Sequence, residues 1–171
     1  MKASVHPTPF RAFVAAALVS VGCGGASASR GPSAEKGASP SNAGGVEACL
    51  ANADARHERK PSEPTRITVK HVLVRYAGAK RAPATITRTR EQACLRAEVA
   101  LTKLHEGTSF ADVVSAFSDE SGAATREGSL GQVERGDVDP KFADAAFELA
   151  PGEVSQVVET GFGFHLILRV E

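Results

Sequence analysis

Two apolar runs lie far apart in the chain, and each is directly preceded by a histidine. His71 precedes the run over 72–74, and His165 precedes the run over 166–168. Runs of valine, leucine and isoleucine of this length predict strands buried in a sheet. An imidazole in such a strand is costly unless its ring nitrogens are hydrogen-bonded. We therefore expect the histidines to mark the first and last strands of one small domain, either facing each other or satisfied separately within the core.

The apolar spacing around these runs predicts further helices and strands. The predicted elements are a short helix over 46–59, a strand over 67–76, a loop over 78–87, helices beginning at 89 and at 109, a loop over 118–131 from which a short strand over 129–133 emerges, a helix beginning at 139, and a hairpin with strands over 154–159 and 164–170. Thr89 and Gln92 fit a capping box, and Asp139 precedes a proline that suits the first helical turn. This order predicts an α+β fold with a small, mostly antiparallel four-stranded sheet surrounded by about four helices.

Composition limits the number of domains and the class of partner. The chain has 171 residues, 42% of them hydrophobic, and a formal net charge of zero. This size suits one small soluble domain with additional segments rather than two full domains. Because basic and acidic residues balance, there is no electrostatic reason to expect a nucleic-acid partner.

The first residues have the pattern of an export signal. Lys2 and Arg11 precede an apolar run over 13–21 that is too short for a membrane span. We therefore expect a signal peptide over 1–22. The segment ending at Cys23 resembles the signal of bacterial lipoproteins, and this resemblance implies that Cys23 is lipidated and attaches the chain to a membrane. Ordinary signal-peptidase cleavage, with Cys23 removed or incidental, is the alternative.

A segment rich in glycine, serine, alanine and proline follows Cys23 and continues to about residue 45. Such a composition buries too little apolar surface to offset the entropy of ordering, so we expect a flexible tether. The chain then divides into a signal peptide, a region over 23–64 that holds the anchor cysteine, the tether and a short helix, and a folded domain over 65–171. By analogy with enterobacterial sorting, the glycine after Cys23 favours the outer membrane, with the domain facing the periplasm.

Two further cysteines, Cys49 and Cys94, lie on predicted helices. In an exported protein they could form a disulfide, because export leads to oxidising surroundings. Two separate buried thiols fit the sequence equally well, since nothing in it fixes the distance between them.

Six short motifs between residues 67 and 171 carry the main functional signal. In chain order they are HVLV from His71, FSD from Phe117, GSLG from Gly128, FADAAF from Phe142, GEVS from Gly152 and TGFGFH from Thr160. Their order and spacing resemble the parvulin family of peptidyl-prolyl cis-trans isomerases over essentially a whole parvulin domain. The resemblance implies the parvulin fold and catalysis of rotation about X–Pro bonds.

Such an activity has modest chemical requirements. The barrier to rotation, roughly 18–20 kcal/mol, comes from amide resonance, and no bond is broken. A catalyst has to favour the twisted amide over both planar forms, which calls for an apolar slot for the proline ring and a few polar groups around the carbonyl. Neither a metal nor an organic cofactor is required, and the implied partners are proline-containing polypeptides. We expect the protein to act as a monomer.

The resemblance assigns the proline slot to Leu130, Val138 and Phe142. Many family members carry methionine in place of Val138, so a shallower slot is implied here. Val138 and Phe142 flank the predicted helix start, where a loop could present both side chains on one face. Plain core packing is the alternative for these two residues, and Phe142 could serve both purposes.

The polar part of the site is assigned in the same way. His71 and His165 match the paired histidines of the family, with Thr160 in the same network, and this implies an orienting rather than a proton-transferring role. The two histidines have no further ligand at the spacing of a metal site. Glu120 falls at the family's central polar position, but Asp119 is adjacent, and which acid reaches the site is open. A solvated loop acid is the alternative.

Arg75, Lys80 and Arg81 lie at the end of the first strand and in the following loop. In phosphorylation-directed parvulins, basic residues in comparable places bind a phosphate before the proline. Such a cluster could bind a phosphoryl or carboxylate group through charge-assisted hydrogen bonds. Preference for an acidic residue before proline and a solvated loop without a substrate role are the alternatives.

The sequence therefore predicts an exported, lipid-anchored peptidyl-prolyl cis-trans isomerase that acts on exported or unfolded proteins. The alternative function is a non-catalytic parvulin-fold chaperone or an interaction module of the cell envelope.

Overall fold

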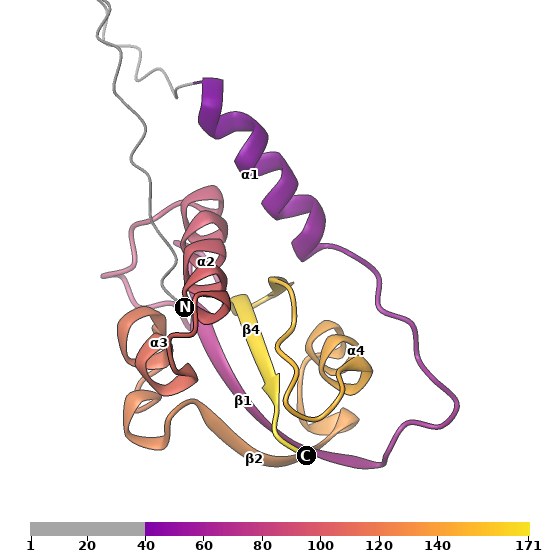
Figure 1. The fold of residues 1–171 in the computed structure, drawn as a ribbon. Coiled ribbons are helices and arrows are strands. Elements are labelled where there is room, and N and C mark those ends of the chain that lie inside the picture. Colours follow the sequence, from indigo (N-terminus) through magenta and orange to yellow (C-terminus); the bar gives the residue numbers. More distant parts are fainter. Residues whose placement is uncertain (1–39) are drawn as a thin grey trace, which may run out of the picture. The chain divides into compact units, whose positions relative to one another are not determined.

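A computed structural model describes residues 40–171, in which four strands form one antiparallel sheet (Figure 1). The strands are β1 (Arg66–Val74), β2 (Ser129–Glu134), β3 (Val158–Thr160) and β4 (Gly163–Arg169). Their order across the sheet is β2–β1–β4–β3, so the two histidine-containing strands are the central pair. The expected α+β class with four strands and four helices is confirmed for the described residues.

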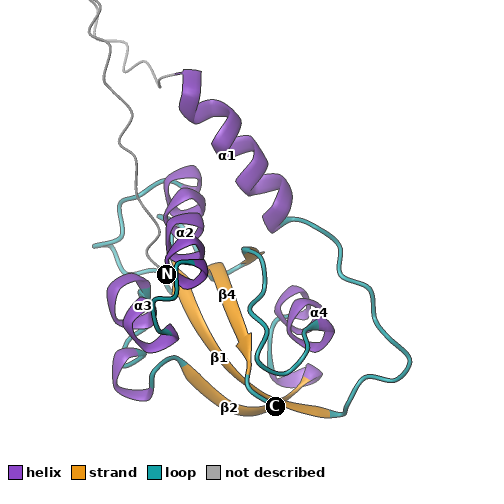
Figure 2. Cartoon of the chain, viewed as in Figure 1, coloured by secondary structure: helices purple, strands orange, loops and turns teal. Residues whose placement is uncertain are grey.

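The helices are α1 (Pro40–Ala53), α2 (Arg90–His105), α3 (Phe110–Phe117) and α4 (Pro140–Glu148) (Figure 2). Three of them begin where local sequence signals predicted. Thr89 and Gln92 form the expected capping box of α2, and the Ser109 side chain accepts a hydrogen bond from the backbone of Asp112 in α3. Asp139 caps α4 with proline at the first helical position.

Two predicted elements have the wrong bounds. The helix expected over 46–59 is α1, which starts six residues earlier and ends at Ala53. The chain after Ala53 leaves the helix because its side chains form ion pairs with α4 and the turn before it. In the hairpin, Val154 makes only an isolated bridge with Leu168, and β3 starts at Val158. Between these two residues the Ile167 backbone N–H donates to the Ser155 hydroxyl and not to a backbone carbonyl, which interrupts the regular ladder.

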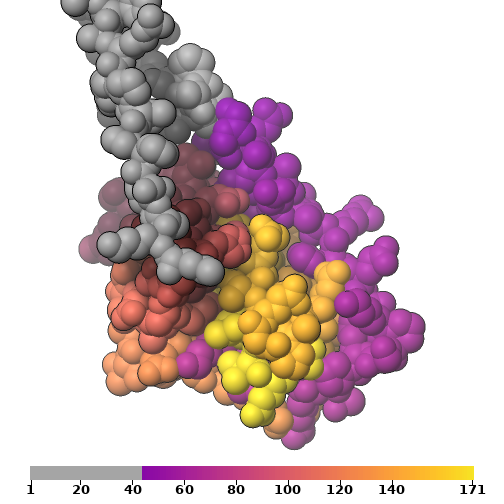
Figure 3. All heavy atoms as spheres, viewed as in Figure 1, coloured from indigo at the N-terminus to yellow at the C-terminus, as the bar shows by residue number. Residues whose placement is uncertain are grey.

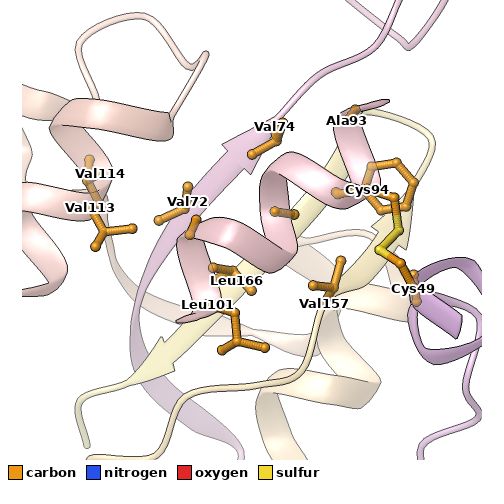
Figure 4. Packing of buried hydrophobic residues seen from close by; sticks show 14 of the residues in the cluster. Cys49, Val72, Val74, Ala93, Cys94, Leu101, Val113, Val114, Val157 and Leu166 are labelled. Atoms are coloured by element: carbon orange, nitrogen blue, oxygen red, sulfur yellow. A yellow bond between two sulfur atoms is a disulfide. The ribbon is translucent and has the colours of Figure 1, made fainter. Parts of the chain in front are cut away.

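The sheet separates two hydrophobic cores because alternate strand residues face opposite sides. On one side, Val72 and Leu166 pack with α2 and α3 (Figure 4). On the other side, Val69 and Ile167 pack with α4. His71 and His165 share this second side, where the Phe142 ring of α4 contacts both imidazoles. The arrangement places two polar side chains at the margin of a core.

The structure resolves the alternative left open for Cys49 and Cys94, which form a disulfide. Their Cα atoms are 6.1 Å apart, and both side chains are buried beside Val157 and Leu166. Figure 4 shows the bond joining α1 to α2. Because α1 contains two glycines and a weak apolar face, this covalent link is a major part of what holds it against the domain.

The segment between α1 and β1 (residues 54–65, the linker segment) runs past α4, as the purple atoms beside the orange and yellow ones show (Figure 3). Asp54 pairs with Lys141, and His57 with Glu148. At its far end, the Glu63 carboxylate receives two hydrogen bonds from Arg135, of 2.9 and 2.6 Å.

The Glu63–Arg135 pair is the most buried of these contacts, since the Glu63 side chain is only 7% exposed. The Lys60 backbone N–H also donates to Glu63, and the Arg135 guanidinium lies 4.8 Å from the centre of the Phe147 ring. Arg135 opens the short turn η2 (Arg135–Asp137), which leads directly into Val138 and α4. The linker segment thus fixes the approach to the predicted proline slot.

The expected signal peptide over 1–22, Cys23 and the first part of the tether lie outside the described residues. Among residues 40–171, no helix has the length and apolar character needed to span a membrane.

Replacing both cysteines (Cys49→Ser with Cys94→Ser) should lower the free energy of unfolding by about 2–4 kcal/mol, because the disulfide constrains the unfolded chain. Denaturant unfolding monitored by circular dichroism measures the change. Reduction should destabilise the natural protein by a similar amount and leave the double variant unaffected. Equal midpoints for the oxidised protein and the variant would show that the disulfide does not support the fold.

Candidate active site

The two histidines lie side by side on adjacent strands. Leu73 of β1 pairs with His165 of β4, and His71 pairs with Ile167, so the imidazoles are diagonal neighbours on one face. Their rings are stacked, with centroids 5.5 Å apart and planes inclined by 18°. Both residues are buried, and their Nδ1 atoms are 3.3 Å apart. The structure brings together the pair that the sequence pointed to.

A chain of hydrogen bonds extends from both sides of this pair. Thr160 Oγ1 lies 2.8 Å from His165 Nε2, and His71 Nε2 lies 2.8 Å from Glu120 Oε2. The Phe162 backbone N–H donates to Thr160 Oγ1. The chain therefore runs from the β3–β4 turn through both imidazoles to a carboxylate at the edge of the site.

The chemistry of the end groups gives this chain a direction. An ionised carboxylate only accepts, so His71 Nε2–H donates to Glu120. With both rings neutral, His165 Nδ1–H donates to His71 Nδ1, and the Thr160 hydroxyl donates to His165 Nε2. If His71 takes up a proton, it donates at both nitrogens, and His165 must then adopt its other tautomer. The two rings are therefore coupled in protonation and tautomer.

The pKa shifts agree with this assignment for two members. Burial, followed by the proximity of His71 and Arg75, places the pKa of His165 well below its ordinary value of 6.5. The hydrogen bond from His71 lowers the pKa of Glu120, aided by the nearby Arg126 and opposed by partial burial. His165 is thus neutral and Glu120 ionised at neutral pH.

An apolar slot adjoins the polar chain. Phe142 of α4 contacts both imidazoles edge-on, with ring centroids 5.8 Å from His71 and 5.3 Å from His165. Leu130 sits at a bulge of β2, where it has no partner in the register with β1, and its side chain is thereby turned toward the site. Val138 completes the set at the end of η2.

These side chains surround a cavity of about 250 Å³. Its lining residues are His71, Leu73, Arg75, Arg81, Glu120, Leu130, Asp137, Val138, Asp139, Phe142, Phe162 and His165. The structure therefore brings together both histidines, Glu120 and the whole predicted slot. Thr160 does not line the cavity and acts on it through His165.

Asp119 and Glu120 are distinguished by the groups to which each is hydrogen-bonded. Asp119 accepts a hydrogen bond from the Arg75 backbone N–H and pairs with Arg88, so it fixes the loop after β1. Glu120 instead lines the cavity and bonds His71. The two adjacent acids thus have separate roles, and Glu120 is the one that reaches the site.

The three basic residues lie near one another, but only two of them line the cavity. Arg75 and Arg81 line the cavity, whereas Lys80 is absent from its described lining. Arg75 donates to the Lys80 carbonyl, and this shapes the loop. Lys80 and Arg81 lie over the Phe162 ring, 5.8 and 5.9 Å from its centre. Of the predicted set, Arg81 is therefore the cation best placed to meet a ligand.

Sequence reasoning missed several participants. Phe162 and Asp137 line the cavity, and Arg126 pairs with Glu120 from a short 3-10 turn, η1 (Ala124–Arg126). Phe162 lies within the TGFGFH motif, so its place between Thr160 and His165 was an available signal. Arg126 gave none, because its proximity to Glu120 depends on the turn.

Comparison with known proteins decides the family. A model of the PPIC-type PPIASE domain matches residues 55–171, more than half of the chain. The chain belongs to the PpiC-type peptidyl-prolyl cis-trans isomerase family. The parvulin resemblance seen in the sequence is thereby confirmed, and the matched region contains every cavity residue.

Individual relatives agree with this family. The chain is 35% identical over 127 residues to peptidyl-prolyl cis-trans isomerase ESS1 of Saccharomyces cerevisiae, covering 70% of this chain and 74% of that protein. It is 36% identical over 104 residues to the chaperone SurA of Photorhabdus laumondii, covering 60% of this chain and only 22% of SurA. The solved structure of ESS1 from Candida albicans superposes with a TM-score of 0.59 at 29% identity, over 63% of each chain.

His165 should remain neutral at pH 6, where a free imidazole of pKa 6.5 is about three-quarters protonated. The unfolded state takes up this proton first as pH falls below 6.5, so His165 should reduce stability by up to about 1.4 kcal/mol per pH unit in that window. Nitrogen NMR of the ring should show a neutral imidazole, with one of its two nitrogens protonated. If the NMR shifts of the His165 ring instead show it becoming charged with a midpoint near pH 6.5, the ring is not held neutral in the buried hydrogen-bond chain.

Proposed function

We propose that this chain catalyses rotation about X–Pro bonds in exported or unfolded polypeptides, with the proline ring in the slot of Leu130, Val138 and Phe142. The observation that carries the proposal is the meeting of this apolar slot with the Glu120 end of a buried hydrogen-bond chain. A cavity with only apolar walls would hold a proline ring without acting on its amide.

The geometry suits the energetic requirement of the reaction. The planar amide resists rotation through resonance, so a catalyst has to stabilise the twisted form more than either planar form. The slot holds the ring while the remaining peptide rotates. The Glu120 carboxylate, fixed beside the slot, disfavours the planar carbonyl through repulsion of its oxygen and favours the twisted amide. His71, His165 and Thr160 orient Glu120 and transfer no proton to substrate.

The basic side of the cavity supports a preference for an acidic group before proline. Arg81 and Arg75 line the wall of the cavity, and the Arg81 guanidinium lies over the Phe162 ring. A carboxylate or a phosphate could each accept charge-assisted hydrogen bonds here. A carboxylate is the favoured ligand, because an exported enzyme would meet few phosphorylated sites before proline.

Export and lipid attachment at Cys23 form part of the proposal. The signal-like pattern over 1–22 supports export, and so does the Cys49–Cys94 disulfide, since such bonds persist mainly in oxidising compartments. The domain then stands away from the outer membrane on its tether, as a monomer facing the periplasm.

Catalysis is tested by a protease-coupled assay on proline peptides. Glu120→Gln should lower kcat/KM by about 10–100-fold, because it removes the charge beside the carbonyl. The control Lys103→Gln, which breaks an exposed pair with Glu106 on α2, should match the natural protein. No acceleration by the natural protein, together with suppressed aggregation of an unfolded client, would identify a non-catalytic chaperone instead.

The same assay tests the residue before proline, with leucine, glutamate and phosphoserine peptides. Arg81→Gln should slow the glutamate peptide by about two- to fivefold and leave the leucine peptide unchanged. Equal effects on both peptides would remove the anion role, and acceleration confined to phosphoserine would reverse the proposed preference.

Membrane attachment is tested by palmitate labelling in a bacterial host. The natural chain should incorporate the label and sediment with membranes, whereas Cys23→Ser should do neither. Labelling that survives the substitution would refute lipidation at this residue.

A further inference from the structure

Arg126 makes three hydrogen bonds at the edge of the site. Its Nε donates to the Ser129 carbonyl at 3.1 Å, its Nη1 donates to the Ser121 carbonyl at 3.3 Å, and its Nη2 pairs with Glu120 Oε2. All three guanidinium nitrogens therefore have a partner, two on the loop between α3 and β2 and one at the first residue of β2. A guanidinium held in this way has one orientation and is a fixed positive group.

The backbone brings Arg126 to this place. The turn η1 ends at Arg126, and Glu127 and Gly128 follow with φ values of 53° and 73°, which turn the chain back into β2. A Cβ on Gly128 would lie 2.4 Å from the His71 carbonyl oxygen, so the loop is pressed against β1 at the histidine. His71 and Arg126 thereby reach the same carboxylate from two sides.

Glu120 needs such support because its side chain is long. Three rotatable bonds separate its carboxylate from the backbone, and their freedom is lost when the group is held in one place. Both His71 and Arg126 bond the same oxygen, Oε2. Oε1 has no hydrogen-bond partner among residues 40–171, and Glu120 lines the cavity. The carboxylate is thus fixed through one oxygen and left open at the other.

We propose that Arg126 is a positioning residue for the isomerase reaction, which holds Glu120 so that Oε1 faces the amide of a bound proline peptide. The inference rests on the proposed function, since it assigns Arg126 a role through Glu120. Arg126 is absent from the described cavity lining, so its role is assigned through Glu120 and not through contact with substrate.

The charged surroundings of Glu120 make the role of Arg126 measurable. His71 on β1 contacts the carboxylate directly, and His165 on β4 lies behind it. The other charged groups of the cavity are Arg75, Arg81, Asp137 and Asp139. Arg126 is the one permanent cation bonded to Glu120 among the described residues, and its charge and hydrogen bond both lower the Glu120 pKa. Its removal should therefore raise that pKa.

A double-mutant cycle provides the test. Arg126→Gln should lower kcat by about tenfold with little change in KM, and Arg126→Lys should recover part of the loss. In the Glu120→Gln background, Arg126→Gln should have no further effect. Arg66→Gln is the matched control, because it breaks a comparable exposed pair with Glu134 away from the cavity and should leave the kinetics unchanged.

The pH profile and carboxylate NMR add readouts that a purely structural role would not move. The acid limb of kcat/KM and the Glu120 carboxylate titration should both shift to higher pH in Arg126→Gln. A loss of activity that is equal in both backgrounds, or an unmoved Glu120 titration, would overturn the positioning role.

The outcomes separate this inference from the proposed function. If the natural protein does not accelerate isomerisation, the function fails, whereas the NMR titration still reports on the Arg126–Glu120 pair. If Glu120→Gln is slow but Arg126→Gln matches Arg66→Gln, the function stands and the positioning role is wrong.

Discussion

A buried hydrogen bond between His71 and His165 joins β1 and β4, the two central strands of the sheet. The rest of the site depends on it. A shift of one residue in the pairing of β1 and β4 would leave one imidazole on this face and turn the other toward the core packed by α2 and α3, so the two rings would lose each other as partners. Each unsatisfied ring would then cost about 1–3 kcal/mol. The pairing of β1 with β4 that buries the apolar side chains is therefore also the pairing that gives both imidazoles their hydrogen-bond partners.

The polar chain and the apolar slot come from different parts of the fold. Thr160, His165 and His71 lie on the sheet, whereas Val138 and Phe142 enter from η2 and α4. The relative position of these two parts is fixed by Phe142, which packs on both imidazoles, and by the Glu63–Arg135 pair of the linker segment. A site assembled before substrate arrives avoids reorganisation during the reaction, and this is how electrostatic groups act most effectively. The linker segment thus contributes to the position of η2 and α4 through its ion pairs.

Much of the fold could be predicted because local signals and burial agree. The runs after His71 and His165 gave the central strands, and the caps at Thr89 and Asp139 gave two helix starts. The bounds of α1 could not be predicted, because this helix is held by a disulfide and the segment after it by ion pairs such as Asp54–Lys141. The start of β3 could not be predicted because it depends on the hydrogen bond between Ile167 and the Ser155 hydroxyl.

The candidate site, like the fold, could be predicted from the sequence only in part. The histidines and the slot were visible in motifs, so their meeting in one cavity was expected. The choice of Glu120 over Asp119 was not visible, because it depends on which acid meets His71 and which meets Arg88. Arg126 was missed for the same reason, since a turn with two left-handed residues brings it back to Glu120. Motifs gave the residue types, and tertiary contacts gave the partners.

We expect the buried hydrogen-bond chain, and not the cavity lining alone, to set the isomerase activity. Exchange NMR on a proline peptide with substoichiometric protein measures this most directly, with Thr160→Val as the probe, because Thr160 lies outside the described cavity lining. We expect cis–trans exchange with the natural protein and a rate about tenfold lower with Thr160→Val at equal folded fraction. Equal exchange rates for the two proteins would contradict it.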